Sequence, residues 1–152
     1  MYTIRRANVD DIPVLVEFRG KMYGSMDASI DFDEIRGICE EYYETHMEDG
    51  SLVAWVAEDG DGAAVACVAA SLYRLPPKPE NPDGRYVYVF NLFTEPGHRR
   101  RGLAGRLLGE TVDHARDIGV GHVTLHASEM GRPLFSSHGF VESNEMSYTF
   151  EP

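Results

Sequence analysis

The chain has 152 residues, of which 43% are hydrophobic, and a formal net charge of −11. This length suffices for one well-buried core and gives no reason for a second, so we expect a single domain over residues 1–152. The negative charge argues against nucleic acid and anionic membranes as partners, because both attract a positive surface.

The first half of the chain predicts a strand, two helices and a β-hairpin. Apolar residues at helical spacing indicate the helices, and two Asp-Gly pairs at residues 59–62 favour a tight turn between the hairpin strands. In chain order we expect a strand at Thr3–Ala7, a helix capped by Asp10 or Asp11, a helix from Asp31 or Asp33 to Gly50, and strands at Leu52–Glu58 and Ala63–Tyr73.

The second half begins with a loop at Leu75–Arg85 that contains four prolines. Too little chain follows for the loop to be a linker to another domain. The elements expected after it are a strand at Tyr86–Phe93, a helix at about Arg101–Ile118, a strand at Val120–Ala127, a short helix at Arg132–His138 and a last strand at Met146–Phe150.

The junction at Pro96–Arg106, between a β-rich run and an amphipathic helix, is the most informative part of the sequence. A strand-to-helix turn presents free backbone N–H groups at the start of the helix. The glycines of this junction let an anion approach the backbone, and its arginines supply charge-assisted donors. The sequence therefore predicts a phosphate site here.

Charge is divided unevenly along the chain. Residues 1–84 hold 17 acidic against 7 basic side chains, whereas residues 85–152 hold 8 against 7. Such a division favours a polyanionic cofactor in the second half and a cationic substrate in the first. Solubilising surface charge is an alternative explanation, and it stays open at this point.

Cysteine and histidine patterns give no metal site. Cys39 and Cys67 stand far apart without CxxC spacing, and the six histidines form no HExxH motif. The sequence also lacks a GxxxxGK[ST] phosphate loop, a secretory signal core and any run near the roughly 20 apolar residues that span a bilayer. We expect a protein without a metal in a reducing, cytoplasmic location.

Three segments resemble the GNAT N-acetyltransferases. Phe90–Pro96, followed by Arg99-x-x-Gly102-x-Ala104, is similar to the acetyl-CoA-binding motif of that family, Gln/Arg-x-x-Gly-x-Gly/Ala. Ile4–Ile12 and Pro133–Phe140 resemble its first and last elements. The resemblance implies an α/β (α+β) domain whose mixed, mostly antiparallel twisted sheet has six to seven strands and about four flanking helices. A splayed parallel pair of strands would bind the cofactor.

The resemblance also implies acetyl-CoA as cosubstrate. Backbone groups of the strand before the loop would pair with the pantetheine amides, and the N–H groups at residues 100–105 would hold the pyrophosphate. The cofactor-binding residues implied in this way are Leu92, Phe93, Thr94, Arg99, Arg100, Arg101, Gly102, Leu103, Ala104, Gly105, Arg106 and Phe135.

The implied chemistry is direct attack of a primary amine on the acetyl thioester. Many relatives carry a tyrosine acid where this chain has Phe135, so Ser136, His138 or a water would have to substitute. Where some relatives place a glutamate base, this chain has Thr124. His126 follows on the same strand face and is a candidate base, because neutral imidazole accepts protons near pH 7. Asn91 is a second candidate, able to orient water or substrate.

The expected acceptor is a small cationic amine or a peptide amine. Glutamates of the second helix, namely Glu34, Glu40, Glu41 and Glu44, could attract it or act through water. Tyr42 and Tyr43 could line its groove or belong to the core. Edge strands near the C-terminus make a homodimer reasonable. The missing acid and base leave open an alternative, an acyl-CoA-binding sensor or regulatory module with little turnover.

Overall fold

A sheet of five strands forms the centre of the molecule, in a computed structural model that describes residues 1–152. The strands are, in spatial order, β1 (Thr3–Arg6), β2 (Leu52–Glu58), β3 (Ala64–Arg74), β4 (Arg85–Thr94) and β5 (Val123–Leu125). Neighbours are antiparallel except for β4 and β5, which run parallel. The predicted mixed, mostly antiparallel sheet is confirmed, with five strands in place of six to seven.

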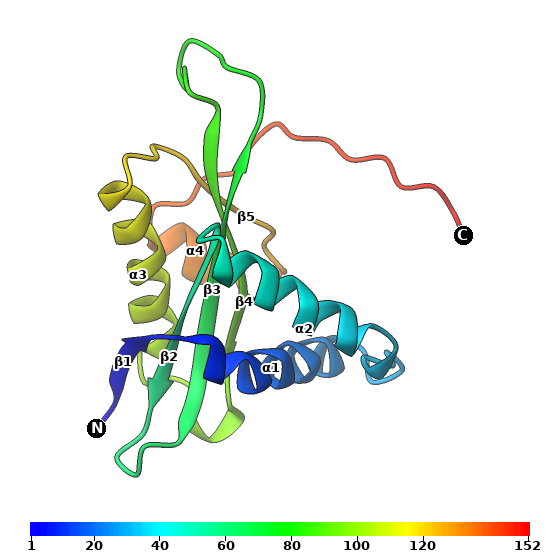
Figure 1. Cartoon of the computed structure of the whole chain (residues 1–152), viewed down its shortest axis with the longest axis vertical. Coiled ribbons are helices and arrows are strands. Elements are labelled where there is room, and N and C mark those ends of the chain that lie inside the picture. The colour runs from blue at the N-terminus through cyan, green and yellow to red at the C-terminus, as the bar shows by residue number, and fades with distance from the viewer.

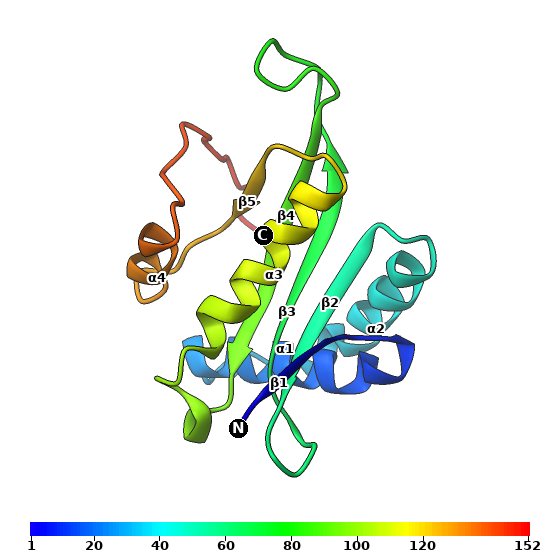
Figure 2. The ribbon, with the colours of Figure 1, turned by 90° about the vertical axis from the view of Figure 1, so that its left-hand side faces the viewer.

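Helices cover both faces of this sheet (Figures 1 and 2). The four helices are α1 (Ile12–Met26), α2 (Asp33–Glu48), α3 (Leu103–Asp117) and α4 (Arg132–Ser137), and short 3-10 turns lie at Val9–Asp11 and Pro96–His98. One face carries α1 and α2, and the other carries α3, so the sheet separates two apolar cores. No helix is both long and apolar enough to cross a membrane.

The hairpin of β2 and β3 contributes residues to both cores, because its small and β-branched side chains are buried on both faces of the sheet. Its turn forms as the Asp-Gly pairs predict. The Asp59 carboxylate accepts hydrogen bonds from the N–H groups of Asp61 (2.9 Å) and Ala63 (3.0 Å), and Gly62 takes the positive φ of 82° that the turn requires.

Helix α2 buries a narrower stripe than its sequence pattern predicts. Tyr43 is fully buried and Cys39 packs beside it, but Ile35 and Ile38 are exposed. The helix contacts α1 and β2, and the side chains of Tyr42 and Tyr43 reach Ser71 of β3 and Asn91 of β4, so only the stripe that faces these elements is buried.

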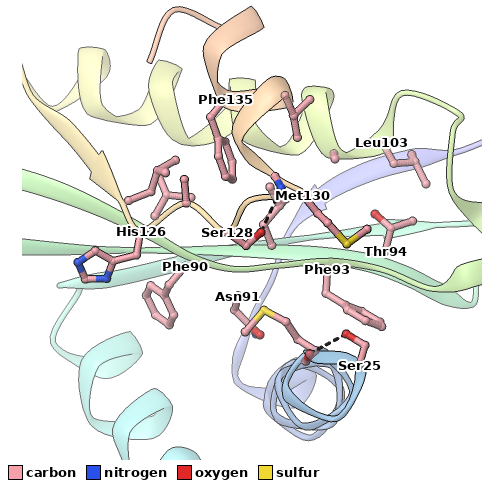
Figure 3. Close-up of a pocket in the computed structure, with 18 of the residues that line it drawn as sticks. Ser25, Phe90, Asn91, Phe93, Thr94, Leu103, His126, Ser128, Met130 and Phe135 are labelled. Carbon is pink, nitrogen blue, oxygen red and sulfur yellow. Dashed lines mark hydrogen bonds between the residues drawn. The ribbon is translucent and has the colours of Figure 1, made fainter. Parts of the chain in front are cut away.

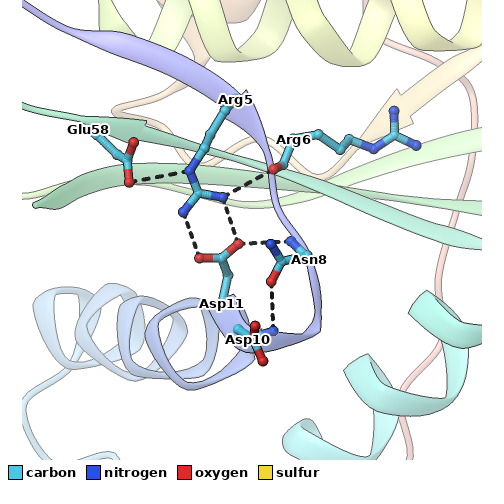
Figure 4. A network of polar contacts seen from close by, with 6 residues as sticks. All are labelled: Arg5, Arg6, Asn8, Asp10, Asp11 and Glu58. Atoms are coloured by element: carbon cyan, nitrogen blue, oxygen red, sulfur yellow. Dashed lines mark hydrogen bonds and ion pairs between the residues drawn. The ribbon is translucent and has the colours of Figure 1, made fainter. Parts of the chain in front are cut away.

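The start of α1 is fixed by polar contacts that also bind β1 (Figure 4). Asn8, not an aspartate, caps the 3-10 turn, because its side chain accepts from Asp10 N–H (2.8 Å) while the Asp11 carboxylate accepts from Asn8 N–H (2.8 Å). Arg5 donates two 2.8 Å hydrogen bonds to Asp11 and lies 3.3 Å from Glu58. Asp11 is the N-cap residue of α1, one of the two predicted positions, but its side chain makes no capping hydrogen bond to that helix and instead binds Arg5 and Asn8.

The chain after α4 departs from the prediction of a last strand at Met146–Phe150. Residues 138–152 contain no helix or strand, and the segment runs out from the domain to the free C-terminus (Figure 1). The side chains of Tyr148 and Phe150 are 83% and 82% exposed. Residues 146–150 have the composition of a strand, but a strand needs a neighbour to pair with, and this segment has none in the monomer.

Candidate active site

A cavity opens where β4 and β5 separate. The two strands pair from Val87↔Val123 to Val89↔Leu125 and then part, while β4 continues to Thr94. The cavity has a volume of about 1120 Å³ and is lined by β4, by the segment between β5 and α4, by α1 and by the first turn of α3. This volume exceeds the roughly 300–1,000 Å³ of a pocket for one drug-sized ligand, so the cavity has room for more than one small molecule.

A β-bulge places Asn91 and Leu92 at the centre of the cavity wall. Cys67 of β3 pairs with Phe93, and Ala69 pairs with Phe90. Asn91 and Leu92 therefore face a single residue of β3, which is Val68. Asn91 has φ of 56°, a left-handed conformation that asparagine tolerates better than most residues.

The Asn91 side chain fixes this bulge against α1 and α2. It is 2% exposed, and its amide donates to the Leu15 carbonyl (3.0 Å) and to the Tyr43 hydroxyl (2.8 Å). Burial raises the pKa of Tyr43, which keeps the hydroxyl protonated. Both amide protons of Asn91 are therefore engaged, and only Oδ1 lacks a partner.

The other end of the cavity has the properties of an anion site. Gly102 precedes α3 with φ of 78°, and the first helical hydrogen bond joins Arg106 N–H to the Gly102 carbonyl (3.1 Å). The N–H groups of Leu103, Ala104 and Gly105 are thus free at the positive end of the helix dipole. These donors lie in the cavity wall, where they suit a phosphate group.

The arginines of this loop have different positions. Arg99 donates from Nε to the Thr94 carbonyl (2.9 Å), and its guanidinium carbon lies 5.7 Å from the centre of the Phe93 ring, so it secures the turn. Arg100 lines the cavity with φ of 63°. Arg101 and Arg106 are exposed and do not line it. Of the residues that the resemblance implies for the cofactor, these two alone lie outside the cavity wall.

His126 and Tyr88 form a pair at the opposite end of the cavity, which we call the acceptor end because we expect a substrate there (Figure 3 shows His126 beside Phe90). The Tyr88 hydroxyl lies 2.9 Å from His126 Nδ1. Burial raises the pKa of Tyr88, and the positive charge of Arg19 opposes this effect. Thr124 does not line the cavity, and its hydroxyl is 2.9 Å from that of Tyr73.

Phe135 lines the cavity and packs against Phe140, with ring centres 6.1 Å apart. Neither Ser136 nor His138 lines the cavity, and His138 Nδ1 lies 2.9 Å from the Leu134 carbonyl. The hydroxyl near Phe135 is that of Ser128, which accepts from Gly131 N–H (3.1 Å) and keeps its own proton to donate (Figure 3).

The sequence did not single out Ser128, whose side chain lines the cavity. Its position two residues beyond His126, in the turn after a strand, was the available signal. The acidic side chains of α2 lie elsewhere: Glu40 and Glu44 line a separate hollow beside Pro13. Glu129 is the carboxylate in the wall of the main cavity.

The chain belongs to the GNAT acetyltransferases, because residues 25–140 match the model of the acetyltransferase (GNAT) family. Two solved structures share its fold along almost the whole length. A predicted acetyltransferase with acetyl-CoA from Clostridium acetobutylicum is 29% identical with a TM-score of 0.88, over 99% of this chain and 96% of that one. A GCN5-related N-acetyltransferase from Ralstonia eutropha is 28% identical with a TM-score of 0.89, over 99% of both chains.

More distant structures share the fold alone. Glucosamine-6-phosphate N-acetyltransferase from Arabidopsis thaliana is 19% identical, with a TM-score of 0.74 over 99% of both chains. A search of the curated proteins found no match. The splayed strands, the bulge and the glycine loop at the start of α3 are thus the frame of an acetyltransferase.

Proposed function

We propose that this chain is an N-acetyltransferase that moves the acetyl group of acetyl-CoA to a primary amine by direct attack. The observation that carries the proposal is one continuous cavity with an anion-binding helix start at one end and the His126–Tyr88 pair at the other. A phosphate-bearing thioester and an acceptor can therefore meet at β4, where the strands part.

The residues present fit coenzyme A. The free N–H groups at Leu103, Ala104 and Gly105 would hold the pyrophosphate. Beyond Val89, the edge of β4 that faces β5 has no strand beside it, and this edge would pair with the pantetheine amides. Acetyl-CoA supplies an activated acetyl group as a thioester. Arg100 would add a charge-assisted donor to the phosphates.

His126 would accept the proton of the attacking amine. When Nδ1–H of His126 donates to the Tyr88 oxygen, Nε2 is left as an acceptor. Tyr88 thereby sets the tautomer and the orientation of the ring, which is the supporting role that a second hydrogen-bonded group gives to a general base.

Ser128 would stabilise the departing thiolate. Its hydroxyl keeps a free proton, whereas Phe135 has none to give. A hydrogen bond to a charged sulfur lowers the barrier because it strengthens as the charge develops. Ser128 donates a hydrogen bond without transferring its proton, since a serine hydroxyl is a far weaker acid than a thiol.

The test is calorimetric titration of acetyl-CoA into the native protein and into Gly102→Glu. A carboxylate beside the free N–H groups should repel phosphate, so we expect affinity to fall by at least about a hundredfold, the equivalent of about 2.7 kcal/mol. Gly62→Glu is the matched control: it has the same charge and a similar positive φ, and a new Cβ meets no atom there either.

Equal affinity in native protein and in Gly102→Glu would refute the placement of the pyrophosphate. A thiol-release assay with pooled amines then separates an enzyme from the alternative, an acyl-CoA sensor. Binding followed by release of coenzyme A is expected of the enzyme, and binding without release on any amine favours the sensor.

A further inference from the structure

Arg19 lies at the acceptor end of the cavity and has no acidic partner. It comes from α1, lines the cavity and forms no ion pair, although the chain has 25 acidic residues. Its Nη2 donates to the Tyr23 hydroxyl (3.1 Å), and its guanidinium carbon lies 5.2 Å from the centre of the Tyr23 ring and 5.4 Å from that of Phe90.

Five of the eleven other arginines of the chain have carboxylate partners within 4 Å, namely Arg5, Arg36, Arg85, Arg116 and Arg132. Arg19 instead has aromatic rings beside its planar face, an arrangement that holds the side chain in place. A guanidinium has five N–H donors, and one of them is used here. The remaining donors are available to a ligand in the cavity.

The surroundings of Arg19 suit a small ligand with an apolar body. Met22, Met26 and Met130 line the same cavity, and flexible thioether side chains adapt to varied apolar shapes. The carboxylates of α2, which led us to expect a cationic acceptor, lie outside this cavity. The Phe90 ring beside Arg19 stacks on the Tyr88 ring, with centres 5.8 Å apart, so the arginine lies at the same end as the His126–Tyr88 pair.

We infer that the acceptor amine also carries an anionic group, a carboxylate or a phosphate, which Arg19 binds while the amine faces His126. A carboxylate in this position makes the acceptor an amino acid with an apolar side chain or a close analogue. Arginine binds such oxyanions through two parallel N–H···O bonds, which also orient the ligand. The inference rests on the proposed N-acetyltransferase function and names its substrate class.

Matched acceptor pairs test this inference. Phenylalanine and 2-phenylethylamine differ by one carboxylate, and glucosamine-6-phosphate and glucosamine differ by one phosphate. We expect the anionic member of at least one pair to have kcat/KM at least about tenfold higher, and the pair that shows it identifies the anion.

Arg19→Gln should remove that preference by raising KM for the anionic acceptor at least about tenfold, with little change for the neutral partner. Arg36→Gln is the matched control, since Arg36 also lies over an aromatic ring, 5.3 Å from that of Phe32, but outside the cavity. Turnover with no preference, or equal losses for both members in Arg19→Gln, overturns the inference alone. Coenzyme A binding without turnover on any member overturns the proposed function with it.

Discussion

Asn91 offers the sharpest test of how the sheet is opened. Replacing it with alanine removes two buried hydrogen bonds, to the Leu15 carbonyl and the Tyr43 hydroxyl. It also places at φ of 56° a residue that tolerates the left-handed conformation less well than asparagine does. The lost bonds cost about 1 kcal/mol each and the left-handed conformation about 1 kcal/mol more. Removal of the unpartnered Oδ1 offsets about 1 kcal/mol, which leaves a loss of about 2 kcal/mol.

The decisive comparison is between Asn91→Ala and Asn91→Gly. Glycine loses the same hydrogen bonds but adopts positive φ without strain, so we expect it to be about 1 kcal/mol more stable than alanine. At an ordinary strand position the order is reversed, because glycine loses more conformational freedom on folding. Urea unfolding followed by circular dichroism measures both midpoints and their slopes.

An alanine variant as stable as the glycine variant would show that the bulge does not depend on the left-handed conformation of Asn91. A loss below about 0.5 kcal/mol in both would show that the amide bonds do not hold it, because surface substitutions produce changes of that size. We also expect a weaker affinity for acetyl-CoA in both variants, since a relaxed bulge narrows the separation of β4 and β5.

Three further predictions concern single side chains. His126→Gln should lower kcat/KM by about 10²–10⁴-fold, the range for loss of a general base, and an unchanged value would remove His126 from the mechanism. Ser128→Ala should lower kcat by about tenfold or more at nearly unchanged KM for acetyl-CoA, and a change in KM alone would instead indicate a binding role. The hydrogen bonds from Arg5 hold the pKa of Asp11 below its usual range. The ionised Asp11 carboxylate therefore stabilises the fold fully above the pKa of about 3.9 that it has in the unfolded chain. This stabilisation is lost as pH falls through the lower pKa that the carboxyl has in the folded chain. Stability of the native chain should fall more steeply below pH 4 than that of Asp11→Asn, and equal slopes would contradict the prediction.

The helix start with free N–H groups could be predicted because its signal is local. The glycines and arginines of residues 96–106 follow a strand and precede an amphipathic helix, and that order alone specifies a helix start open to anions. The hairpin of β2 and β3 could be predicted for the same reason, since its turn depends on Asp59 and the following glycines.

The bulge and the acceptor end could not be predicted in this way. Asn91 takes its conformation from the register between β3 and β4 and from contacts with two helices distant in sequence. In the sequence Arg19 has the pattern of an ordinary helical residue, and only the folded structure places aromatic rings beside it. The strand expected at residues 146–150 has the right composition, but composition cannot specify the neighbour with which a strand pairs.

Transfer of an acetyl group to an amine is the central claim, and mass spectrometry of the reaction products tests it most directly. Native protein is incubated with acetyl-CoA and the matched acceptor pairs, with Gly102→Glu and Gly62→Glu in parallel. We expect an N-acetylated acceptor, formed in step with free coenzyme A, from the native chain and from Gly62→Glu but not from Gly102→Glu. Hydrolysis of acetyl-CoA without an acetylated acceptor, or no consumption of a bound thioester, would contradict the account.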